Sequence, residues 1–135
     1  MLDRSLPYFG VNGIYYLSER IRKYTKIYGE KTAWENIKFQ IFISEEGGSG
    51  GSGFRYLYTN FLQEAAHFLN DEQLNAFTIP MRKIADQWQH FALEANRQYE
   101  GRKERNINYL ADIIYTCAQM EEKLFKYLKE WVNTK

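Results

Sequence analysis

Apolar side chains recur at helical spacing over residues 54–69, and this pattern limits the fold more than any other in the chain. The stripe is uninterrupted and consists of Phe54, Leu57, Tyr58, Phe61, Leu62, Ala65, Phe68 and Leu69. Asn60, Gln63 and His67 lie on the other side of a helical wheel. Steps of one, three and four residues are typical of one face of an amphipathic helix. The sequence therefore predicts a helix over this stretch.

Similar spacing recurs elsewhere and predicts an all-α fold, an irregular bundle of four to five helices. The further helices are expected over residues 13–28, from residue 32 to about residue 45, from residue 80 to about residue 99, and from about residue 103 to residue 132. A short segment beginning at Asn70 or Asp71 precedes the fourth of these helices. Aromatic residues make up 17% of the chain, which predicts an aromatic-rich core.

Local signals mark the expected helix boundaries. Gly29 has the position of a C-terminal cap, and residues 32–35 (Thr-Ala-Trp-Glu) match a capping box that would start the second helix. Pro80 removes a backbone donor and clashes with the preceding turn, so we expect a break near Thr78 and Ile79. The chain of 135 residues has the length of one domain. We divide it into an N-terminal helical pair (1–46), a Gly/Ser stretch (47–53) and the main helices (54–135).

The charge of the chain argues against nucleic acid and membrane partners, and its cysteine content indicates the compartment. The formal net charge is +1, which leaves no electrostatic signal for nucleic acid or for a membrane surface. No run approaches the roughly 18 apolar residues that span a bilayer. Cys117 is the one cysteine, so no internal disulfide forms, as is usual in a reducing compartment. We expect a cytoplasmic protein in which this thiol is a small buried hydrophobe.

The run Gly47-Gly48-Ser49-Gly50-Gly51-Ser52-Gly53 precedes the clearest helix. Its glycines spell a nucleotide-binding fingerprint, but no strand precedes them and no Gly-Lys-Ser/Thr follows, so a nucleotide fold is rejected. Two origins stay open: an artificial flexible linker, or a natural glycine-rich loop before a helix. In the second case, backbone N–H groups with Arg55 in the first helical turn form a candidate anion site. Its proposed ligand-binding residues are Gly51, Gly53, Phe54, Arg55, Tyr58 and Glu121.

Glu121 is an acidic residue within the apolar stripe of the last helix. A buried carboxylate has to be paired, hydrogen-bonded or protonated, and Arg55 and tyrosine hydroxyls are candidate partners. Two readings are open, a structural polar tie within the core and a ligand-facing carboxylate.

Other reactive residues do not combine into a recognisable site. Glu64 and His67 match one half of a helix-bundle di-iron motif, but the other histidine, His90, is on a polar face with Asp86 and Glu94. We therefore expect no metal and no cofactor. No Ser/His/Asp or Cys/His/Asn set has a plausible spacing, so the chain is not expected to be an enzyme on its own.

The glycine run is followed by Phe54-Arg55-Tyr56-Leu57-Tyr58 and then by Phe61-Leu62-Gln63-Glu64-Ala65-Ala66. This order resembles the C-terminal helical domain, of unknown function, in proteins like butirosin biosynthesis protein H. Looser matches cover residues 8–10, 84–88 and 118–122. The family segment has Thr after its first Gly, whereas Gly48 stands there in this chain.

The resemblance implies an accessory domain rather than a catalyst. In that family a cysteine-peptidase-like domain precedes the helical one, and butirosin biosynthesis protein H is an acyltransferase that uses an acyl carrier protein. The catalytic cysteine and histidine of that preceding domain correspond to no position here. The expected function is a non-catalytic binding domain that helps to bind a carrier protein or an acceptor. The alternative is a structural or homo-oligomerisation module without a small-molecule site.

Overall fold

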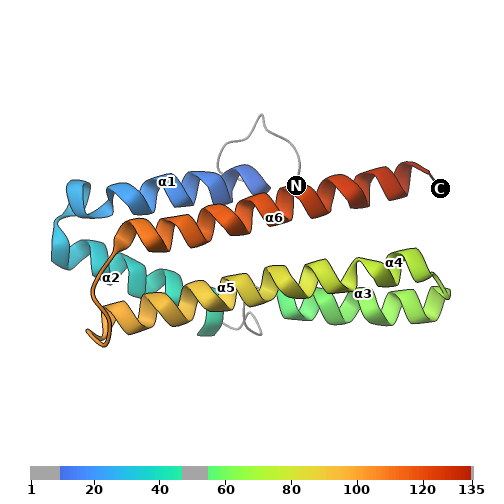
Figure 1. The fold of residues 1–135 in the computed structure, drawn as a ribbon, viewed down its shortest axis with the longest axis horizontal. Helices are drawn as coiled ribbons and strands as arrows, with labels where there is room; N and C mark the ends of the chain where they lie inside the picture. Colours follow the sequence, from blue (N-terminus) through green and yellow to red (C-terminus); the bar gives the residue numbers. More distant parts are fainter. Residues whose placement is uncertain (1–9, 47–54, 135) are drawn as a thin grey trace.

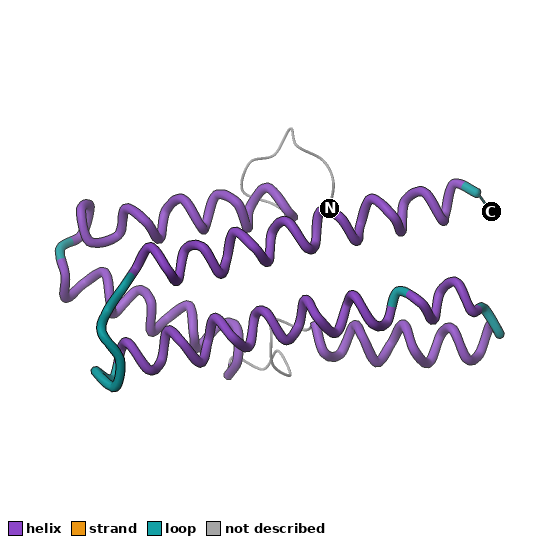
Figure 2. The backbone as a smooth tube through the Cα atoms, viewed as in Figure 1, coloured by secondary structure: helices purple, strands orange, loops and turns teal. Residues whose placement is uncertain are grey.

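The computed structural model describes residues 10–46 and 55–134, and every regular element within them is helical. The elements are α1 (Gly10–Tyr28), α2 (Glu30–Ile41), the π-helical turn η1 (Phe42–Glu46), α3 (Arg55–Leu69), α4 (Glu72–Ala76), α5 (Thr78–Tyr99) and α6 (Ile107–Asn133). Within the described ranges, Figure 2 shows short turns between α1 and α2 and between α3 and α4, and a longer connection at residues 100–106. The predicted all-α fold is confirmed. The Gly/Ser stretch at residues 47–53 lies outside the described residues.

The long helices α5 and α6 run antiparallel and form the centre of the fold (Figure 1). α1 packs on α6, α2 packs on α1 and α5, and α3 packs on α5 and α4. Figure 1 shows α2 and α3 following one another along α5, whereas α1 covers the N-terminal half of α6. In this arrangement α3 is an outer helix that rests on one side of the central pair.

The α4–α5 junction follows the expectation from Pro80. The Asp71 side chain accepts a hydrogen bond from the Leu74 amide and so caps the first turn of α4. The helical structure is interrupted at Phe77, and α5 begins at Thr78. Pro80 therefore lies in the first turn of α5. The missing proline N–H would be unsatisfied there in any case, so the helix loses no hydrogen bond.

Four predicted helix starts were wrong. α1 begins at Gly10 rather than at residue 13, and α5 begins at Thr78 rather than at residue 80. α2 begins at Glu30, with Gly29 at φ 80° as its N-cap, so the expected capping box at Thr32 lies inside the first turn. The glycine conformation allows α2 to start directly after α1, before the capping box is reached. α6 begins at Ile107 instead of near Lys103, because the Asn106 side chain accepts a hydrogen bond from the Tyr109 amide at 3.0 Å.

The core is mainly aliphatic, so the predicted aromatic-rich core is not observed. Among the described residues, the buried aromatic side chains are Tyr24, Trp34, Trp88 and Phe91. Most of the remaining core consists of Ile, Leu, Ala and Met side chains from α1, α2, α5 and α6. Many of the other tyrosines and phenylalanines are exposed at the surface. Their number in the sequence therefore reflects surface as well as core positions.

Candidate functional site

Arg55, Trp88 and Glu121 form a polar cluster that joins three helices. Arg55 in α3 donates two hydrogen bonds to the Glu121 carboxylate in α6, from Nε to Oε1 at 2.9 Å and from Nη2 to Oε2 at 3.0 Å. Trp88 Nε1 in α5 donates to Oε2 at 3.2 Å, and the Arg55 guanidinium lies 4.3 Å from the centre of the Trp88 ring. Glu121 is only 3% exposed. Of the candidate partners named from the sequence, Arg55 is the one that pairs with it among the described residues, and Trp88 is a partner that the sequence did not indicate.

This geometry explains the acidic residue in the core. A fork-shaped guanidinium matches a carboxylate with two parallel hydrogen bonds, and stacking on an indole ring adds a cation–π contact. The cluster therefore holds α3 against α5 and α6. An anionic ligand at Arg55 would meet a guanidinium whose charge is already compensated by the Glu121 carboxylate. Of the other proposed ligand-binding residues, Gly51, Gly53 and Phe54 lie outside the described residues.

The apolar stripe of α3 is largely exposed, which the sequence pattern does not reveal. α3 buries Thr59, Leu62 and Ala66. The exposed fractions of its other large apolar residues are 51% for Leu57, 39% for Tyr58, 61% for Phe61, 87% for Phe68 and 63% for Leu69. We call these five residues the outer face. The predicted site residue Tyr58 belongs to it and stacks on Phe61, with ring centres 6.2 Å apart.

The wheel geometry of α3 separates the two apolar surfaces. At about 100° per residue, Leu57, Phe61 and Phe68 fall within about 40° of one another, and all five residues of the outer face fall within about 120°. The buried residues fall on the adjoining arc, which faces α5. α5 and α4 pack against the arc of the buried residues. No described residue covers the arc of the outer face.

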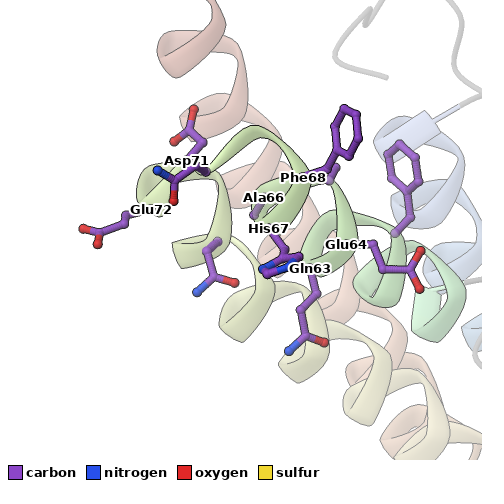
Figure 3. A pocket seen from close by; sticks show the side chains of 11 residues that line it. Gln63, Glu64, Ala66, His67, Phe68, Asp71 and Glu72 are labelled. Carbon is purple, nitrogen blue, oxygen red and sulfur yellow. The ribbon is translucent and has the colours of Figure 1, made fainter.

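A broad open hollow of about 960 Å³ runs along α3 and α4. Phe61 and Phe68 of the outer face line it, together with Glu64, Asp71 and Glu72. In Figure 3, Phe68 extends to the opposite side of α3 from Gln63, and Asp71 and Glu72 point outward from the far end. A hollow of this size is large enough for side chains of a partner protein.

The charged side chains along this hollow are acidic. Glu64 and Glu72 are exposed, and neither forms an ion pair with another described residue. No lysine or arginine is among the described residues that line the hollow, and His67 is its one basic side chain. No group of three metal-ligating side chains occurs in the described part of the chain. The chemistry of the hollow is therefore that of an apolar surface with carboxylates beside it.

Cys117 lies in the core, as predicted. Burial raises the pKa of the Cys117 thiol far above its ordinary value, and the negative charge of Glu121 raises it further. The thiolate, which is the reactive form, is therefore suppressed at neutral pH.

This environment predicts that Cys117 resists alkylation in the folded protein. Incubation with iodoacetamide at about pH 8 should leave the native chain unmodified, whereas the chain unfolded in urea should take up one carbamidomethyl group. Intact-mass spectrometry measures both. Rapid modification of the native chain would show that the thiol reaches solvent.

The described structure thus defines an all-α domain with an uncovered apolar face. The chain belongs to the family described as a domain of unknown function, DUF4872, which matches residues 1–128. No curated protein and no solved structure matches the chain. The family match does not link the chain to proteins like butirosin biosynthesis protein H. No described helix is both long and apolar enough to cross a membrane.

Proposed function

We propose that this chain is a non-catalytic binding domain that docks onto another protein through the outer face of α3. The observation that supports this is the exposure of five large apolar side chains on one side of α3. Exposed apolar patches of several hundred Å² are rare on monomeric proteins and commonly mark interaction sites. Phe68, which is 87% exposed, gains nothing from folding of this chain alone.

The resemblance to proteins like butirosin biosynthesis protein H suggests a specific setting. In this proposal the outer face docks onto the preceding catalytic domain of such an acyltransferase and helps it to bind its carrier protein or acceptor. The Arg55–Glu121 pair then acts indirectly, by holding α3 in place. The proposed location is cytoplasmic.

Isothermal titration calorimetry tests the docking. The titrants are the isolated cysteine-peptidase-like domain of a butirosin biosynthesis protein H-like protein and, separately, its holo acyl carrier protein. We expect the catalytic domain to bind, and the double variant Phe61→Ser/Phe68→Ser to bind at least about tenfold more weakly, because it loses two apolar anchors. Leu93→Ser is the control, since Leu93 is an exposed apolar residue of α5 and not of the outer face. Equal binding by the double variant, or no binding to either titrant, would contradict the proposal.

The same apolar face is the surface that the alternative, a homo-oligomerisation module, would use. Analytical ultracentrifugation of the chain alone distinguishes the two. A dimer that Phe61→Ser/Phe68→Ser dissociates, together with no binding of either titrant, would support the alternative.

A further inference from the structure

We infer that the outer face binds an amphipathic helix of the partner, with apolar anchors along one side and lysine or arginine residues beside them. This inference rests on the proposed docking function and adds the chemistry of the segment that is bound. Three properties of α3 lead to it: the shape of the apolar row, the charges next to it, and the area that it offers.

The apolar row has the shape that helix–helix contacts use. Leu57, Phe61 and Phe68 are separated by four and seven residues, which keeps them on one line along α3. The row is about 16 Å long, or about three helical turns. A helix satisfies its own backbone hydrogen bonds, whereas an extended or irregular segment would place unpaired peptide groups against this apolar row. A helix of three to four turns is therefore the fitting occupant.

The charges next to the row indicate a basic partner. On the helical wheel Glu64 lies at the edge of the row, about 20° from Leu57 and about 40° from Phe68, and Glu72 follows at the start of α4. Both carboxylates are free of ion pairs with described residues, and Asp71 adds a third acidic side chain. Lysine or arginine beside the anchors of the bound helix would meet these carboxylates, whereas acidic residues there would be repelled.

A second copy of the chain fits this surface less well. If each large side chain offers roughly 200 Å², the exposed fractions of the outer face correspond to about 600 Å² per copy. A stable interface usually buries about 800 Å² on each partner. Glu64 also lies near the middle of the row, so pairing two α3 helices about a two-fold axis would bring two glutamates together.

Fluorescence anisotropy with two labelled peptides tests the inference on the full chain. Both peptides are about 18 residues long, are held helical by side-chain bridges, and share one leucine and phenylalanine face. One carries lysines beside that face, and the other carries glutamates at the same positions. We expect the lysine peptide to bind at least about tenfold more tightly, with a preference that weakens as salt is added.

Variants of the chain identify the groups responsible. Glu64→Lys/Glu72→Lys should reverse the preference in favour of the glutamate peptide, whereas Glu19→Lys/Glu35→Lys, an equal charge change on α1 and α2, should leave it unchanged. Phe61→Ser/Phe68→Ser should abolish binding of both peptides, and Leu93→Ser should not. Circular dichroism confirms that each variant stays helical.

The possible failures are distinguishable. Equal affinity for the two peptides would overturn the basic chemistry and leave the docking intact. If neither peptide binds but the catalytic domain still binds through Phe61 and Phe68, the helical occupant is wrong while the proposed function holds. A dimer that depends on Phe61 and Phe68 and excludes both peptides would show that a second copy is the occupant.

Discussion

Replacing Arg55 with methionine is expected to lower the free energy of unfolding by about 3 kcal/mol at neutral pH. The Glu121 carboxylate is 3% exposed, and among the described residues Trp88 would be its one remaining hydrogen-bond donor. Breaking a buried pair by removing one partner leaves an uncompensated charge, which costs far more than the net contribution of the pair. Urea unfolding followed by circular dichroism measures the change.

The double variant Arg55→Met/Glu121→Leu serves as the control for this prediction. Because both charges are gone, its stability should return to within about 1 kcal/mol of the starting protein, or exceed it. It also separates the two readings of Glu121. Unchanged partner binding by the double variant supports a structural tie, and lost binding with retained stability supports a ligand-facing carboxylate. An effect of Arg55→Met below about 1 kcal/mol would mean that the pair is not desolvated.

Two phenylalanine-to-alanine substitutions are expected to differ by several kcal/mol. Phe91 is 1% exposed, so Phe91→Ala should cost about 4 kcal/mol through lost burial and the cavity that remains. Phe68 is 87% exposed, and Phe68→Ala should change the free energy of unfolding by less than about 0.5 kcal/mol. Urea unfolding compares the two under the same conditions.

The comparison tests whether the outer face is uncovered in solution. A cost above about 1.5 kcal/mol for Phe68→Ala would show that another surface covers this side chain. In that case the measurement is repeated over a range of protein concentrations. A cost that grows with concentration would identify a second copy of the chain as the cover.

Helical periodicity predicted the class of fold and most of the elements, because it depends only on the order of residues along the chain. The break before α5 was predicted correctly, since the steric effect of Pro80 is local. That Glu121 needs a partner was also foreseen, because a charge in an apolar stripe has to be compensated, and Arg55 was one of the candidates named. Both inferences rest on constraints that any packing of the helices has to respect.

The exposure of α3 was not predictable from the same pattern. Phe61 and Phe91 have equivalent places in their apolar stripes, yet one is exposed and the other is buried. Periodicity states which residues share a face but not whether another element covers that face. The width of the apolar arc of α3 could have indicated that part of it is exposed, because a single neighbouring helix covers only part of so wide an arc.

The start of α2 illustrates a different limit. The start of α2 was predicted at the capping box of Thr32, and Gly29 was interpreted as a C-terminal cap of the preceding helix, whereas it is the N-cap of α2. Gly29 adopts a backbone conformation that other residues rarely reach, so the turn between α1 and α2 is tight and the helix begins at once. Local signals rank such alternatives poorly because tertiary packing decides between them.

The position of α3 couples docking to the opening of the domain. α3 has fewer buried side chains than α1, α2, α5 or α6, so detaching it exposes less core than detaching any of those helices. Its amide protons should therefore exchange with solvent through a partial opening that leaves α5 and α6 intact. A partner that binds the outer face more tightly when α3 is docked than when it is detached shifts this local equilibrium and raises the stability of α3 by mass action. Slower amide exchange in α3 is therefore the expected sign that a partner is bound to the outer face.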